Sequence, residues 1–231
     1  MARRMLSDEL IKTLAENCAP VRPLAHPARR ALVWFAFSLC YVAVVVALMG
    51  VRPDLLAKLA DPQFATELAA AFLTSIVAAA GAFSAGCPVR PVWERFAAGI
   101  FLSVWAGALA VGCWRDIRAF GLAGLLAHSD IYCLPTILAI SIPAALLILS
   151  MVRRGAPIAP FVTIGLAALA STALAAAALR LSFRQDAAVS VCIWQFGSVV
   201  LLTGIASLFG RALLHWTMRD ALLASIQAHR R

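Results

Sequence analysis

Apolar residues occur along this chain in continuous runs, which short polar and often basic segments separate. Each run is about 20 residues long, the length of α-helix that crosses the roughly 30 Å hydrocarbon core of a bilayer. Polar and apolar residues do not alternate within the runs, as they would in the strands of a membrane β-barrel. The pattern predicts an all-α, polytopic membrane protein with six spans, at Ala31–Val51, Phe64–Ala85, Trp93–Cys113, Ile131–Val152, Phe161–Arg180 and Val189–Gly210.

A different pattern precedes the first span. Ser7 is a good N-cap for a short helix, and Pro20 ends it. Apolar residues recur on one face of this helix at helical spacing, and we call them the N-terminal stripe: Leu6, Leu10, Ile11 and Leu14. Such a stripe either lies on a membrane surface or docks into a groove on a partner protein. We favour a protein partner, because the first turn of the helix is acidic and anionic lipid would prefer a basic one.

These patterns divide the chain into three parts. Residues 1–30 form a cytoplasmic helix and linker for docking a partner, residues 31–210 form the six-helix transmembrane domain, and residues 211–231 form a basic cytoplasmic tail. We expect no cleavable signal peptide, since the first apolar run begins only near Ala31 and is long enough to span.

Charge predicts the orientation of the spans. The chain is 63% apolar and only 13% charged, with a net charge of +9, whereas about a quarter of a soluble domain is charged. Most of the 20 basic residues lie in the two tails and in segments 86–95 and 153–158. By the positive-inside rule, we expect both termini in the cytoplasm. We expect this face to contact anionic lipid rather than nucleic acid, because the chain has no folded basic module.

The tryptophans fit the same frame. Indole prefers the boundary between lipid and water. The sequence places Trp34, Trp93 and Trp216 at the inner boundary and Trp114 and Trp194 at the outer one. Trp105 falls inside a span, where we expect it either in the bundle or facing lipid. Pro143 lies inside the fourth span and should bend it.

The spans carry little chemistry. No ionisable residue lies deep in any of them, which argues against an ion-coupled transporter. No HExxH, Walker A, GxSxG or paired-carboxylate arrangement is present, so we do not expect an enzyme. A passive channel or small-molecule carrier is the alternative, and it would need a polar path. The hydroxyl groups available for such a path are those of Thr74, Ser75, Ser103, Ser171, Thr172 and Thr203.

Three of the six cysteines, Cys113, Cys133 and Cys192, fall near the expected outer surface at similar depth. If the membrane is a bacterial inner membrane, this level borders an oxidising compartment, and the three thiols could form a disulfide plus one free thiol, or a site for a soft metal ion. The simpler alternative is that they are three small residues used for packing. His128 could join them, although a plain loop histidine is the favoured interpretation. A membrane redox protein would also use such thiols, but no CxxC motif supports that reading.

Several sequence blocks resemble one known family. They follow one another in order from about residue 8 to about residue 215. The blocks are ELIKTLAENCAPVRPL (Glu9–Leu24), GVRPDLLAKLADPQFATELAAAFLT (Gly50–Thr74), VGCWRD (Val111–Asp116), HSDIYCLP (His128–Pro135), MVRRGAP (Met151–Pro157), AAAALRL (Ala175–Leu181) and WQFG (Trp194–Gly197). The chain is similar to the NrsF-type anti-sigma factors, bacterial six-span proteins that negatively regulate ECF sigma factors.

The resemblance implies a partner and a signal. The partner is an ECF sigma factor, held inactive by the cytoplasmic N-terminus. The signal is a metal or oxidant sensed by outer cysteines, with Cys133 and Cys192 the first choices and Cys113 the third. The remaining cysteines, Cys18, Cys40 and Cys87, are not carried over. A soft metal ion at the outer cysteines is the one cofactor that the resemblance suggests.

Overall fold

The computed structural model describes residues 9, 12, 25–86, 91, 93–120, 133–153, 159–183 and 190–209, and every element within them is a helix. In chain order these are α2 (Pro27–Met49), α3 (Leu55–Leu59), α4 (Pro62–Ser84), α5 (Trp93–Phe120), α6 (Cys133–Val152), α7 (Pro160–Ser182), the π-helix η2 (Val191–Phe196) and α9 (Gly197–Leu208). Within these residues six helical stretches are long and apolar enough to cross a membrane. The prediction of an all-α, six-span protein is confirmed.

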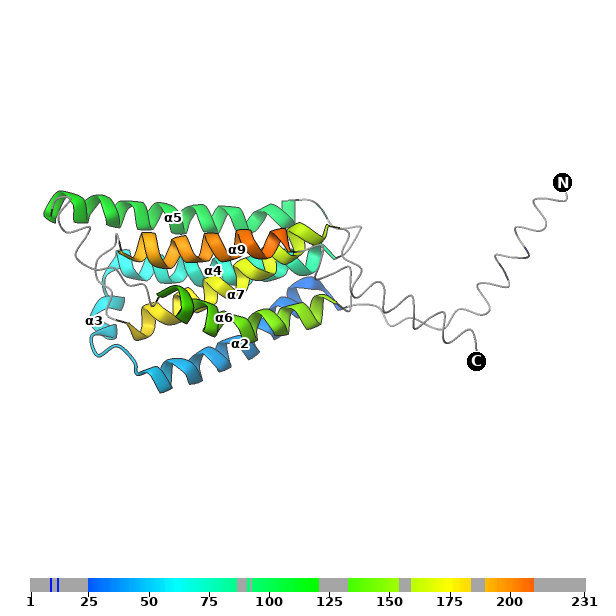
Figure 1. Ribbon diagram of the computed structural model, residues 1–231, viewed down its shortest axis with the longest axis horizontal. Helices are drawn as coiled ribbons and strands as arrows, with labels where there is room; N and C mark the ends of the chain where they lie inside the picture. Colours follow the sequence, from blue (N-terminus) through cyan, green and yellow to red (C-terminus); the bar gives the residue numbers. More distant parts are fainter. Residues whose placement is uncertain are drawn as a thin grey trace.

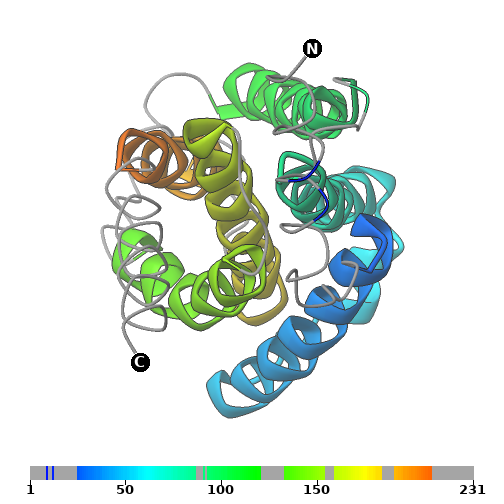
Figure 2. The ribbon, with the colours of Figure 1, turned by 90° about the vertical axis from the view of Figure 1, so that its right-hand side faces the viewer.

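The long helices lie side by side along one axis, so the bundle has two ends (Figure 1). We call the end that holds α3 the α3 end, and the opposite end, where α2 begins, the tail end. Viewed along the axis, α7 runs through the middle of the bundle (Figure 2). It packs against α4, α6, α9 and α2, while α5 packs mainly against α4.

The core lies on α7 and α4. In α7, 83% of the membrane-spanning window is buried and in α4 56%, against 22% in α2, in α5 and in the last span. Runs of alanine line α7, including the stretch from Ala175 to Ala178, where every residue is buried. Small side chains let neighbouring helices approach closely in lipid, where packing drives their association. The remaining helices turn large apolar side chains outward, as hydrocarbon surroundings allow.

Local sequence signals place the helix starts. Three helices, α2, α4 and α7, begin with proline, whose fixed φ suits the first helical position. The Asp61 carboxylate accepts from the Gln63 N–H at 3.1 Å and the His26 Nδ1 accepts from the Ala28 N–H at 3.3 Å, so both are N-caps. After α2 the chain turns through Gly50, whose φ of +90° a side chain would disfavour.

Two helices, α5 and α3, differ most from the sequence prediction. α5 continues to Phe120 rather than ending at Cys113, so Cys113 lies within a helix and not at its end. At 1.5 Å per residue, the 28 residues of α5 are about 42 Å long, longer than the hydrocarbon core is thick. The short helix α3 was not predicted, because its five residues lie in a loop between two apolar runs.

Tryptophan positions divide into two groups. Trp93 and Trp114 are 67% and 57% exposed, as residues of a boundary belt should be. The belt position predicted for Trp34 is wrong: its side chain is fully buried, and its indole Nε1 donates to the Ala144 carbonyl of α6 at 2.9 Å. Trp105 is buried inside the bundle, which settles the open question between bundle and lipid.

Candidate sensing site at the α3 end

Two of the three predicted outer cysteines meet at the α3 end. Cys113 belongs to α5 and Cys192 to η2, two elements that pack against each other. Neither is in a disulfide, and both are half-buried. A side-chain hydrogen bond joins the two thiols. The structure therefore brings together residues that are far apart in the sequence and that no CxxC motif links.

Cys133 is the first residue of α6, and its side chain lies outside what the structure describes, as does His128. The helix it begins packs against η2, the element that carries Cys192. Within the described part of the chain, no three His, Cys, Asp or Glu side chains are grouped to hold a metal ion. The Cys113–Cys192 pair alone supplies two soft ligands, fewer than the three or four protein ligands typical of zinc sites.

The segment that holds Cys192 is a π-helix, which is rare and often occurs at functional sites. The N–H of Gly197 closes this wide turn by donating to the carbonyls of Cys192 and Trp194. Phe196 packs edge-on against Trp105 of α5, with ring centroids 5.2 Å apart. The wide turn thus presents Cys192 and Phe196 to the same neighbouring helix.

Gln195, in the same π-helix, is a buried polar side chain at 1% exposure. Its Nε2 donates to the Ala176 carbonyl of α7, whereas its Oε1 has no hydrogen-bond partner among the described residues. A buried acceptor without a donor costs about 1–3 kcal/mol. The π-helical turn therefore holds an unfavourable group, as segments that change conformation often do.

An ion pair lies beside the thiols. The Arg180 guanidinium of α7 donates to the Glu67 carboxylate of α4 at 2.6 Å, and both side chains are largely buried. Arg180 also lies over the ring of Phe64 at 4.9 Å, and Gln63 donates to the other oxygen of Glu67 at 2.9 Å. The carboxylates of Glu67 and Asp116 both act electrostatically on Cys113. The ion pair with Arg180 neutralises the first of these two carboxylates.

The pattern of polar and apolar residues does not reveal this ion pair. Glu67 and Arg180 both fall inside predicted spans, close to their ends, where single charged residues usually face the boundary. The signal that could have found them is the rarity of ionisable residues within apolar runs, since such residues usually pair inside the bundle.

A second charged contact fixes the loop after α2. The Arg52 side chain is buried and makes two hydrogen bonds of 2.7 Å to the Asp54 carboxylate. The Arg52 N–H donates to the Leu181 carbonyl near the end of α7 at 3.1 Å. This contact ties the α2–α3 connection to the same helix end that carries Arg180.

Comparison with known proteins identifies the bundle. A family model described as NrsF, negative regulator of sigma F, matches residues 14–216. The chain belongs to the NrsF family. No curated protein and no solved structure matches it. The description of the family concerns regulation of a sigma factor, which is a regulatory and not a catalytic role. The six apolar helices make the chain a multi-pass membrane protein.

The predicted docking stripe of this NrsF-family protein lies outside the described residues. This applies to all four of its residues, Leu6, Leu10, Ile11 and Leu14. The match to the family model begins at the last of them. The basic tail from residue 211 onward likewise lies outside. For both segments the sequence predictions stay predictions.

The tail end of the NrsF bundle has its own contacts, which begin three residues into α2. The Arg30 guanidinium donates to the Met151 carbonyl of α6 and lies over the ring of Phe83 at 4.5 Å. One turn later, Trp34 makes its hydrogen bond to Ala144. The first two turns of α2, which continue directly from the predicted docking segment, are therefore held against α6 and α4.

Proposed function

We propose that the chain is an anti-sigma factor of the bacterial inner membrane, which sequesters an ECF sigma factor through its cytoplasmic N-terminal segment. The observation that carries this proposal is the match to a negative regulator of sigma F over most of the chain. The six spans supply the membrane anchor. Residues 1–30 are the docking part, residues 31–210 the transmembrane domain and residues 211–231 a basic cytoplasmic tail.

The proposed orientation puts the tail end in the cytoplasm and the α3 end outside. Its support is the concentration of basic residues in the tails and in the loops at the tail end. Single-cysteine variants that keep only Cys18 or only Cys133 test it with a membrane-impermeant maleimide. Cys133 should react in intact cells, and Cys18 only after lysis. Labelling of Cys18 in intact cells, with Cys133 labelled only after lysis, would show that the proposed orientation is wrong.

The proposed signal acts on the thiols at the α3 end. Cys113 and Cys192, with Cys133 as a third thiol, would hold a soft metal ion. Alternatively, an extracytoplasmic oxidant such as a small disulfide would take two electrons and two protons from two of these thiols, which then form a disulfide. Either change would move η2 against α5, because Cys192 and Phe196 both contact that helix. The contacts of Arg30 and Trp34 would carry the rearrangement to the start of α2 and release the sigma factor.

A test of docking compares two faces of the N-terminal helix. The first variant replaces Leu10, Ile11 and Leu14 with serine, and the matched control replaces Asp8, Lys12 and Glu16 with serine. Co-purification of the full-length chain with a co-expressed ECF sigma factor from the same genome is measured. The stripe variant should lose the sigma factor, and the control should keep it. Equal retention by both variants would rule out the stripe as the docking element.

Sensing is tested with single Cys→Ser substitutions and a sigma-dependent reporter. Replacing Cys113, Cys133 or Cys192 should abolish induction by soft metals or oxidants and leave repression in unstressed cells intact. Cys40→Ser is the matched control, because that thiol lies on the exposed face of α2. Normal induction in all three outer variants would show that these thiols do not sense the signal. It would not contradict the proposal that the chain is an anti-sigma factor.

The hydroxyl groups of the spans do not favour the alternative of a passive channel. Thr74, Ser103 and Ser171 each donate to a carbonyl of their own helix, at Ala70, Gly99 and Ala167. Ser75 donates across to α7, at Ala170. These four hydroxyls are therefore engaged with backbone carbonyls.

A further inference from the structure

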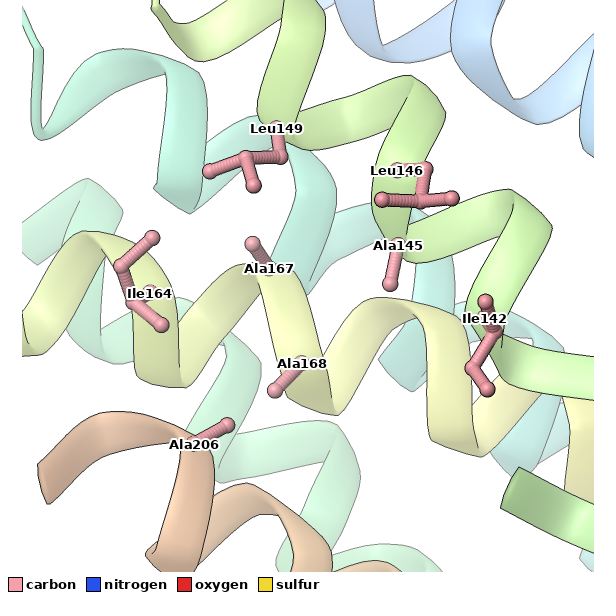
Figure 3. Close-up of a pocket in the computed structure, with 8 residues that line it drawn as sticks. All are labelled: Ile142, Ala145, Leu146, Leu149, Ile164, Ala167, Ala168 and Ala206. Atoms are coloured by element: carbon pink, nitrogen blue, oxygen red, sulfur yellow. The ribbon is translucent and has the colours of Figure 1, made fainter. Parts of the chain in front are cut away.

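A cavity of about 210 Å³ lies between α6, α7 and α9. We call it the α6–α7–α9 groove. Its lining is entirely apolar, with Ile142, Ala145, Leu146 and Leu149 from α6 facing alanines that include Ala168 of α7 and Ala206 of α9 (Figure 3). The groove exists because α7 and α9 contribute mostly alanines to its wall, and alanine side chains are too short to fill the space between these helices and α6.

The groove opens to the outside of the bundle. Ile142 and Leu146 at its edge are 47% and 60% exposed. All three helices are membrane spans, so the medium around this opening is hydrocarbon rather than water. An apolar cavity of roughly 150 Å³ is large enough to bind benzene, and this one is larger and open. A flexible hydrocarbon chain therefore fits the groove in size and polarity.

Positive charge lies at one end of the groove. Ile142, Leu146, Leu149 and Arg153 follow one another at helical spacing along one face of α6. The helical geometry continues to Arg153, whose N–H donates to the Leu149 carbonyl at 2.9 Å. Arg153 is exposed, and it stands about one helical turn, or 6 Å, beyond Leu149.

The neighbouring helix adds to this positive end. α7 begins at Pro160, and its first turn holds no acidic residue. A helix N-terminus is the positive end of the helix dipole and attracts anions. The apolar groove thus ends at a basic side chain and a helix N-terminus, both at the tail end of the membrane domain. An anionic phospholipid is complementary to this arrangement, because its hydrocarbon chain is joined to a negatively charged phosphate.

We propose that the α6–α7–α9 groove binds one acyl chain of an anionic phospholipid, with the phosphate against Arg153 and the first turn of α7. The ligand class is a glycerophospholipid with a net negative headgroup, such as phosphatidylglycerol. A transmembrane helix of a second copy would also cover an apolar groove, but it would bring no phosphate to Arg153. The site is independent of sigma-factor binding and of the thiols.

Native mass spectrometry of the full-length protein in detergent tests the site. The protein is titrated with phosphatidylglycerol and, separately, with phosphatidylcholine of the same chains. The first should bind about fivefold better, the factor that one basic residue near a membrane surface contributes. Arg153→Gln should remove this preference. Arg29→Gln, a change of another exposed arginine at the tail end, should preserve it.

The apolar part of the site needs separate variants. Ala168→Leu and Ala206→Leu each place a larger side chain in the groove from a different helix, and each should reduce binding of both lipids several-fold. Ala110→Leu, on the exposed face of α5, is the matched control and should bind as the unmodified protein does. Circular dichroism and elution volume show which variants retain the fold.

Three outcomes would overturn the proposal. One is equal lipid binding by the groove variants and Ala110→Leu. Another is loss of the phosphatidylglycerol preference in Arg29→Gln as much as in Arg153→Gln. The third is a dimer that Ala168→Leu dissociates, which would assign the groove to a second copy of the chain.

Discussion

At the α3 end, two pairs of side chains that can change their charge or oxidation state join neighbouring elements, whereas at the tail end α2 is joined to α6 by side chains that donate to backbone carbonyls. The pairs at the α3 end are Glu67 with Arg180 and Cys113 with Cys192. A carboxylate can be protonated, and thiols can be oxidised or bind a metal ion. The α3 end therefore contains groups whose interactions change with the chemistry of the surroundings.

The donors at the tail end are Arg30 and Trp34, and their acceptors are the carbonyls of Met151 and Ala144. Neither an indole nor a guanidinium changes its charge near neutral pH, and a carbonyl is not a redox group. These contacts change only when α2 moves relative to α6. The difference between the two ends suggests that the α3 end responds to protons, oxidants or metal ions, and that the tail end responds to movement of α2 relative to α6.

The largest expected effect comes from breaking the ion pair at the α3 end. Arg180→Met leaves the buried Glu67 carboxylate without its cation, and removing one partner of a buried pair costs about 3–5 kcal/mol. The free energy of unfolding should fall by that amount in a denaturant titration in mixed micelles. Arg118→Met, in an exposed residue of α5, serves as control.

The double variant Glu67→Leu/Arg180→Met sharpens the result. A buried pair replaced by apolar residues is often neutral for stability. The double variant should therefore recover most of the stability that Arg180→Met loses. If both proteins were equally unstable, the loss would come from packing at Arg180 and not from an uncompensated charge.

A smaller effect is expected at the tail end. Trp34→Phe removes the hydrogen bond to Ala144 and part of a buried ring, which together cost about 1–2 kcal/mol. The same titration measures the loss. Trp93→Phe, at an exposed position on α5, should change stability by less than about 0.5 kcal/mol. Equal effects of the two substitutions would contradict a specific contact between α2 and α6.

Gln195→Leu tests the buried acceptor in η2. Leucine loses the bond to Ala176 but also removes the Oε1 that has no partner among the described residues, and these two terms oppose each other. We expect unfolding free energy within about 1 kcal/mol of the unmodified protein. A loss of several kcal/mol would show that Oε1 is satisfied in the membrane-embedded protein.

The smallest effect on stability is expected from the thiols. Cys113→Ser and Cys192→Ser keep a small side chain that can still donate a hydrogen bond, so unfolding free energies should change by less than about 1 kcal/mol. The same variants should differ strongly in the reporter assay. A large loss of stability would mean that the pair serves packing rather than sensing.

The sequence predicted the fold well because lipid imposes one simple requirement. An apolar run of about 20 residues must form a helix when water is absent, so the six spans could be located without knowledge of their packing. Cys113 and Cys192 were also expected at similar depth, because successive spans cross the membrane in opposite directions and so place alternate helix ends on the same side.

Pairing between elements was beyond the sequence. Glu67 and Arg180 are 113 positions apart, and neither signals its partner. The π-helix η2 has no sequence signature that separates it from an α-helix. Trp34 was misplaced because an indole near a span end has the same pattern whether it faces lipid or a neighbouring helix. In each case the missing information is which side of a helix faces the interior.

The alanine content of α7 has a mechanical consequence. Alanine has no χ angles, so a helix whose buried face is mostly alanine cannot absorb a push from its neighbours by exchanging rotamers. A displacement at Ala176, whose carbonyl accepts the hydrogen bond from Gln195, would therefore move the whole of α7. The central helix would then move as a stiff rod, and Pro160 would shift by nearly the same distance as the far terminus.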